Sequence, residues 1–89
     1  MTQPLVNPQS PEEIGKRLKR LRKALGKTQA EMAELVGISK RAWGLIEKGA
    51  RRINVGAALR LCDLYGLSLD WIYRGNIAQL PLNLIEKMR

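Results

Sequence analysis

Two basic side chains stand at the start of a predicted short helix, an end where cations are usually disfavoured. Lys40 and Arg41 open a helix expected over residues 40–48. The helix macrodipole favours anions at this end, so two cations there are more easily tolerated when a polyanion comes to meet them. Arg51 and Arg52 follow in a basic loop just beyond the same helix. The chemistry that these residues could perform is ion pairing and hydrogen bonding to an anionic polymer.

A second short helix precedes this one, and a single glycine, Gly37, separates the two. Thr28 and Glu31 have the spacing of a capping box at the start of the first helix, and Ser39 is suited to cap the second. The apolar side chains of the pair would turn to one side: Met32, Val36, Ile38, Trp43 and Ile46. The pattern predicts a helix-turn-helix unit over residues 28–47 that presents its second helix to DNA.

The overall charge agrees with an anionic partner. The chain has 89 residues, with 16 Lys and Arg against 8 Asp and Glu, a net charge of +8 and a pI near 10.3. In one small domain this imbalance favours nucleic acid, a membrane surface or an acidic protein as partner, over the alternative that the charge serves solubility alone. Hydrophobic residues make up 45% with no Phe, so an all-α fold with an aliphatic core and two Trp is expected.

Cysteine and histidine usage excludes several classes of site. Cys62 is the only cysteine and there is no histidine, so we expect no disulfide, no metal site, no cofactor and a reducing, cytoplasmic location. Cys62 is interpreted as a small core residue, because no histidine can activate it. Paired carboxylates at catalytic spacing and a phosphate-binding glycine loop are missing, which argues against an enzyme. No membrane span or signal peptide is expected either.

The N-terminal part divides into an uncharged segment and a basic helix. Residues 1–10 hold two prolines and are expected to form a mobile arm; an arm lying on DNA or on a partner subunit is the alternative, and the lack of Lys and Arg argues against DNA. Ser10 and Pro11 start a helix whose apolar stripe is Ile14, Leu18, Leu21 and Leu25. Its other faces carry cations that are either solvated or bound to phosphates: Lys16, Arg17, Lys19, Arg20, Arg22 and Lys23.

Caps and glycines mark the remaining helices. Asn54 and Ser68 are expected to cap helices over residues 55–65 and 69–74, and glycines end the five helices at Gly26, Gly37, Gly49, Gly66 and Gly75. The core face of the fourth helix is expected to comprise Val55, Ala58, Leu59, Leu61, Cys62 and Leu64. In an apolar tail over residues 76–89, Pro81 can start a sixth helix with Leu82, Ile85 and Met88 on one face. This tail either packs on its own domain or pairs with a second copy.

The segment from Gln29 to Gly49, QAEMAELVGISKRAWGLIEKG, resembles the helix-turn-helix of phage repressors and Cro proteins, the XRE-type regulators. The similarity extends from about Ile14 to Gly75, where LSLDWIYRG resembles the fifth-helix ending of these domains. It implies a compact five-helix DNA-binding domain over residues 11–75. Such domains usually act as homodimers on near-palindromic operators in double-stranded DNA.

The resemblance also implies roles for single residues. Four would face base edges in the major groove, where Lys and Arg can bond guanine: Ser39, Lys40, Arg41 and Leu45. Four would contact phosphates: Gln29, Lys48, Arg51 and Arg52. Arg22 and Glu47 would form a partly buried salt bridge between the first and third helices. Gly44 lies in the middle of the predicted third helix, where glycine is unfavourable, and either it lets the backbone approach DNA or it is merely tolerated.

These expectations define a leading function and one alternative. The leading function is a sequence-specific transcriptional regulator, a repressor whose homodimer sets one helix into each of two half-sites and blocks polymerase. The alternative is a protein-interaction module, such as the antitoxin of a toxin–antitoxin pair, in which residues 77–89 hold the partner protein.

Overall fold

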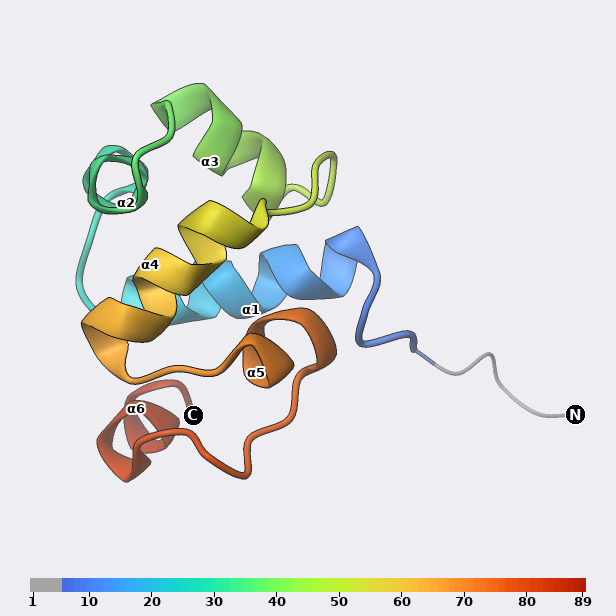
Figure 1. Ribbon diagram of the computed structural model, residues 1–89, viewed down its shortest axis with the longest axis vertical. Coiled ribbons are helices and arrows are strands. Elements are labelled where there is room, and N and C mark those ends of the chain that lie inside the picture. The colour runs from blue at the N-terminus through green and yellow to red at the C-terminus, as the bar shows by residue number, and fades with distance from the viewer. Residues whose placement is uncertain (1–5) are drawn as a thin grey trace, which may run out of the picture.

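Six helices make up the computed structural model, which describes residues 6–89 (Figure 1). Their bounds are α1 Pro11–Ala24, α2 Gln29–Val36, α3 Lys40–Glu47, α4 Val55–Tyr65, α5 Leu69–Arg74 and α6 Leu82–Lys87. The described residues contain no strand, so the predicted all-α fold, with a sixth helix after the first five, is confirmed. None of these helices is long and apolar enough to cross a membrane.

Side-chain caps explain why the first five helices begin where they do. The hydroxyl or amide oxygen of each cap accepts a hydrogen bond from the backbone N–H three residues on, at Ser10, Thr28, Ser39, Asn54 and Ser68. At α2 the capping box is complete, because Glu31 also accepts from the Thr28 N–H at 2.8 Å. Each such cap stabilises its helix by about 1 kcal/mol.

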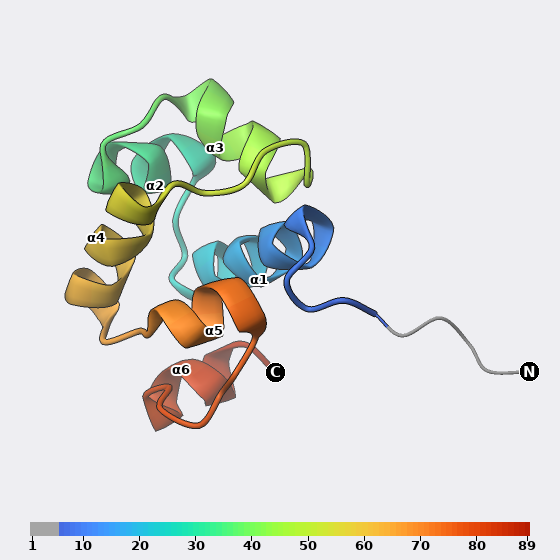
Figure 2. The ribbon, with the colours of Figure 1, turned by 45° about the vertical axis from the view of Figure 1, so that its right-hand side comes forward.

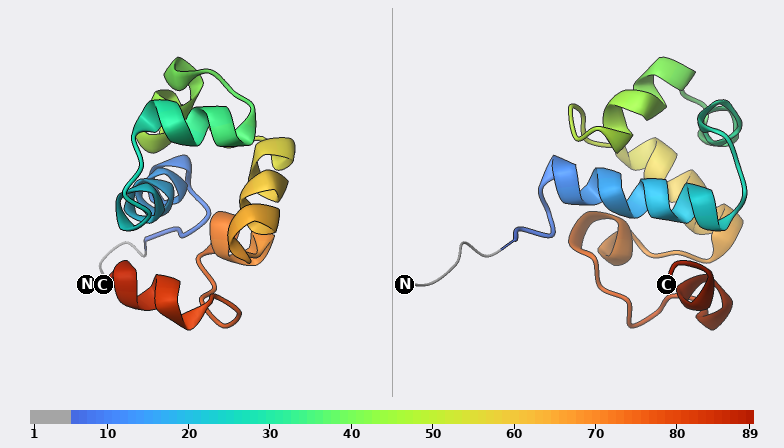
Figure 3. Two further views of the ribbon diagram at one scale, coloured as in Figure 1. Left: turned by 90° about the vertical axis from the view of Figure 1, so that its left-hand side faces the viewer. Right: turned by 180° about the vertical axis from the view of Figure 1, so that it is seen from behind.

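Helix α1 lies at the centre of the arrangement and contacts α3, α5 and α6 (Figures 1 and 2). Of its predicted apolar stripe, Ile14, Leu18 and Leu21 are fully buried, and Leu25 is half-buried against the same core. Trp43 and Ile46 of α3 join the same core. Helices α3 and α6 lie at opposite ends of the molecule, with α1 and α5 between them (Figure 3).

Two glycines let α1 and α3 approach each other closely. A Cβ added to Gly15, inside α1, would lie 2.4 Å from the carbonyl oxygen of Ile46 and 2.7 Å from that of Glu47. Gly49 follows α3 with a φ of 80°, a conformation that disfavours other residues. A Cβ on Gly49 would also lie 2.8 Å from the Cα of Glu12. The end of α3 is therefore pressed directly against the backbone of α1.

The predicted core face of α4 is partly wrong. Val55, Leu59 and Leu64 are exposed by 55%, 46% and 50%, whereas Ala57 is buried beside Ala58 and Leu61. Among the helices, α4 packs mainly on α2 and α5. Because these neighbours cover only one stripe of the helix, the apolar side chains outside that stripe stay in contact with solvent.

The tail packs back on its own domain, which was one of the two expected alternatives. Leu84 is buried against the core, while Leu82 is 68% exposed, so Leu82 does not lie on the buried face as predicted. Leu84 and Met88 are one helical turn apart and share the face that meets the rest of the domain. Leu82 lies two residues from Leu84, which turns its side chain away from that face.

The segment before α1 is held to the domain over its described part. The Ser10 N–H donates to the carbonyl of Asn7 at 3.0 Å. Arg17 donates to the carbonyl of Pro8, and Arg52 donates to that of Gln9 at 2.6 Å. The mobile arm expected over residues 1–10 lies, for residues 1–5, outside the described part of the chain.

Candidate nucleic-acid interface

Helix α3 has one buried and one exposed side. Trp43 and Ile46 face the core, while Lys40 and Arg41 are exposed and Leu45 is half-buried. The exposed cap Ser39 accepts a hydrogen bond from the Ala42 N–H at 3.0 Å. The side of α3 that does not pack against the protein is therefore the side with the two cations.

One surface depression gathers five of the eight side chains expected to touch DNA. Its lining consists of Gln29, Lys40, Arg41, Gly44, Leu45 and Lys48. Three of these carry positive charge and none is acidic. Ser39, Arg51 and Arg52 do not line the depression, although all three are exposed. Arg52 is also engaged with the Gln9 carbonyl, so a phosphate contact would compete with that hydrogen bond.

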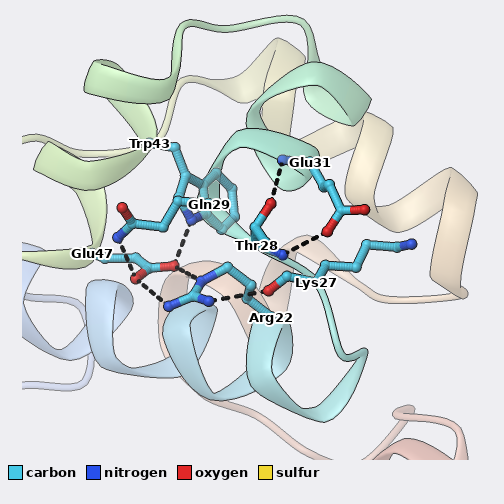
Figure 4. A network of polar contacts seen from close by, with 7 residues as sticks. All are labelled: Arg22, Lys27, Thr28, Gln29, Glu31, Trp43 and Glu47. Atoms are coloured by element: carbon cyan, nitrogen blue, oxygen red, sulfur yellow. Dashed lines mark hydrogen bonds and ion pairs between the residues drawn. The ribbon is translucent and has the colours of Figure 1, made fainter.

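A buried carboxylate holds the underside of this surface together (Figure 4). Glu47, with a side chain only 3% exposed, accepts from Arg22 at 2.7 Å (Nε to Oε2) and at 3.2 Å (Nη2 to Oε1). Gln29 Nε2 donates to Glu47 Oε1 at 3.0 Å, and the Trp43 indole N–H donates to Oε2. Arg22 also donates to the carbonyl of Lys27 at 3.0 Å. The network joins α1, α2 and α3 and the loop between α1 and α2.

The electrostatics of the network favour the charged forms of both partners. Burial alone raises the pKa of the Glu47 carboxyl, but the hydrogen bonds from Arg22, Gln29 and Trp43, with the charge of Arg22, bring that pKa below its usual value. The hydrogen bond to Glu47 in turn raises the pKa of Arg22. No side-chain nitrogen or oxygen buried within residues 6–89 lacks a hydrogen-bond partner.

Gln29 thus contacts the buried Glu47 network and also lines the surface depression. Its amide nitrogen is bound to Glu47, and its amide oxygen would be 3.9 Å from a Cβ placed on Gly44. The side chain braces α3 from the start of α2, where backbone N–H groups suit a phosphate. At Gly44 itself a Cβ would meet nothing else within 4 Å, so packing within the chain does not require glycine there.

Two residues hold segments of the domain together without any local signal in the sequence. Gly15 gave no helix-breaking or turn signal, and its role depends on α3, which lies about 30 residues further along the chain. Arg17 is one of the cations of α1 predicted to be solvated or bound to phosphate, yet it donates to the carbonyl of Ile72 at 3.0 and 3.3 Å. Partial burial lowers the pKa of Arg17. No local pattern distinguishes Arg17 from the other basic residues of α1.

Comparison with known proteins agrees with this architecture. Residues 13–71 match the family profile described as a helix-turn-helix domain. The chain is also 32% identical over 70 residues to the SPbeta prophage-derived uncharacterized HTH-type transcriptional regulator YonR of Bacillus subtilis (strain 168). The alignment covers 79% of this chain and 65% of YonR, so the chain spans just under two thirds of that relative's length. No solved structure matches the chain significantly. The resemblance to XRE-type regulators is confirmed to this extent, and the chain belongs to the helix-turn-helix domain family.

Proposed function

We propose that the protein is a DNA-binding transcriptional regulator that inserts the exposed side of α3 into the major groove. The observation that carries this proposal is the acid-free depression formed by Gln29, Lys40, Arg41, Gly44, Leu45 and Lys48. The depression is concave and positively charged, which suits the edge of a phosphate backbone beside a groove. The family match supports a regulator and not an enzyme.

Within this surface we assign reading and positioning to different side chains. Lys40 and Arg41, exposed on the first turn of α3, would bond guanine N7 and O6. Leu45 would contact a thymine methyl, and the Ser39 hydroxyl would touch the same groove. The remaining four, which flank α3 or brace it, would bind phosphates and set the register: Gln29, Lys48, Arg51 and Arg52.

We further propose that two copies act together as a repressor on a near-palindromic operator. One domain offers four side chains for base reading. A second identical copy would add the same four contacts at a second half-site and so double the length of sequence that is read. Two exposed apolar surfaces are available for pairing: Val55 and Leu59 on α4, and Leu82 on α6. Occupation of the operator by the dimer would block polymerase.

Pairing through the tail can be tested with a point variant. Deleting residues 77–89 would also remove the buried Leu80 and Leu84, so a loss of assembly could reflect unfolding. Leu82→Asn alters only an exposed side chain and should leave the unfolding midpoint unchanged. Sedimentation should then show a smaller dimer fraction than for the unaltered protein, with Leu59→Asn as the matched variant on α4. A dimer that is insensitive to Leu82→Asn would remove α6 from the interface.

Selection of bound sites from random duplex DNA tests the main proposal. The expected outcome is a motif of two inverted half-sites whose centres are about 34 Å apart. Binding should weaken with salt, with a slope of log K on log salt near −0.9 per phosphate neutralised by Lys or Arg, or about −3 in each copy for Lys48, Arg51 and Arg52. The absence of an enriched motif would refute direct readout by α3, and binding that is insensitive to salt would refute the assigned phosphate contacts.

A further inference from the structure

Two adjoining surface depressions form a groove between α1 and the tail, and their linings share Arg20, Met88 and Arg89. Helix α6, on one side of this groove, lies at the end of the molecule away from α3 (Figure 3). We call this surface the α1/α6 groove. None of the eight side chains assigned to DNA lines it.

The floor of the α1/α6 groove is apolar. Trp71 and Leu80 are nearly buried at its base, and Ile85 and Met88 of the tail lie half-buried beside them. Ile77 also lines the groove and is 59% exposed. An exposed isoleucine above an apolar floor gives a binding partner apolar surface to cover.

The rim of the groove is basic. Arg20 and Lys23 of α1 face Lys87 and Arg89 across one of the two depressions. None of these four side chains takes part in the salt bridges found within residues 6–89. Glu13 is the one carboxylate side chain in the lining, and Lys16 pairs with it at 3.1 Å. The groove therefore offers uncompensated positive charge around an apolar floor.

The apolar floor and the basic rim together favour one kind of binding partner over the others. A DNA backbone would use the cations but would leave Ile77 and the apolar floor uncovered. A second copy placed two-fold on this face would bring the same four cations together, and each copy carries a net charge of +8. An amphipathic helix with apolar residues on one side and carboxylates along its flanks matches both the floor and the rim.

We infer that the α1/α6 groove binds an acidic amphipathic segment of another protein. Its apolar side chains would cover Ile77 and Ile85, and its carboxylates would pair with Arg20 and Lys87. Because α6 and α3 lie at opposite ends of the molecule (Figure 1) and no residue of α3 lines the groove, DNA and the partner can be bound together. The inference develops the protein-partner alternative and stands apart from DNA readout, so either can fail alone.

Selection from a displayed library of random peptides of about 16 residues, roughly four helical turns, tests the inference on the full-length chain. The expected binders have Asp and Glu beside apolar residues spaced three and four apart. Each binder is then measured against the protein with Arg20→Glu and Lys87→Glu, which should weaken binding by about tenfold or more. Ile77→Asn should weaken it separately, since this side chain is exposed and its replacement spares the core.

A matched variant with Lys19→Glu and Arg60→Glu has the same net charge, and its altered side chains are also exposed, outside the groove lining and in none of the salt bridges within residues 6–89. Peptide affinity should fall far less in this control. Equal losses in the two variants, binders without acidic residues, or no binders at all would overturn the inference. Displacement of the peptide by a DNA duplex would overturn it too, because it would assign the groove to nucleic acid.

Discussion

Replacing the buried Glu47 by glutamine perturbs the network beneath α3 while keeping the shape of the side chain. The carboxylate accepts four hydrogen bonds, two from Arg22 and one each from Gln29 and Trp43. An amide has only one acceptor oxygen, so its NH₂ group would face donors and about two of the four bonds would be lost. At about 1.5 to 3 kcal/mol for each bond to a charged group, the expected loss is roughly 3 to 6 kcal/mol. Breaking a buried ion pair has a similar cost, about 3 to 5 kcal/mol.

The lower end of this range is the better expectation. Arg22 keeps 15% of its side chain exposed, so water can partly compensate its unpaired charge. A loss of about 3 kcal/mol corresponds to a fall in Tm of roughly 12 to 24 °C in a domain of this size. Urea unfolding at pH 7 measures the loss, and Glu34→Gln on the exposed side of α2 is the matched control, expected to change stability by less than about 0.5 kcal/mol.

Acidification provides the sharper test of the same variant. The folded-state pKa of Glu47 lies below its unfolded value, which is about 4.3. Its contribution to stability is therefore fully present above that value and is lost as the pH falls through the folded-state pKa. Protonated Glu47 resembles glutamine, so the stability gap between the two proteins should close at low pH. A gap that stays constant from pH 7 to acid, or one under about 1 kcal/mol at pH 7, would refute the account of the network.

Three further changes separate reading, positioning and packing. Arg41→Ala should cost about 1 to 3 kcal/mol of DNA affinity and relax preference at one base position, whereas Arg51→Ala should weaken all sequences alike; binding to a panel of operator variants distinguishes them, and uniform losses for both would contradict the assignment. Gly44→Ala should raise the free energy of unfolding by about 1 kcal/mol, because its methyl meets only a distant amide oxygen; a simultaneous loss of DNA affinity would show that the glycine admits DNA. Gly15→Ala should lower stability by about 1 to 3 kcal/mol, since its methyl collides with two carbonyls of α3; unchanged urea unfolding would contradict the close approach.

The helices and their caps were predictable because their signals are local. Thr28 and Glu31 lie within one turn of each other, and so do Ser39 and the N–H group that it caps. The buried sides of α1 and α3 were equally readable, since each has apolar residues at helical spacing. The spacing of apolar residues within a few helical turns is enough to predict the buried side of each helix, whichever distant segment packs against it.

The failures all involve contacts between segments distant in the sequence. Leu59 is apolar and correctly spaced, yet no neighbouring element covers it. Arg17 looks like its basic neighbours, but a carbonyl 55 residues away binds it. Leu82 and Leu84 are the same residue type, and only the docking of α6 decides which of them is buried. The candidate DNA interface was only partly predictable. The sequence indicated its cations, but the depression that brings them together depends on how α2 packs against α3.

The exposed side of α3 is proposed to read bases, and the buried side fixes the helix to the rest of the domain. How well the exposed side chains discriminate bases therefore depends on the buried contacts. Lys40 and Arg41 can discriminate bases only if the helix axis is held steady, since hydrogen bonds to base edges weaken steeply with misalignment. Glu47 and the backbone contact at Gly15 fix the C-terminal half of α3 to α1, and Gln29 ties it to α2. Glu47→Gln should therefore reduce discrimination between operator variants even at temperatures where the protein remains folded. A variant that is less stable but equally selective would show that DNA, and not the network, orients the recognition helix.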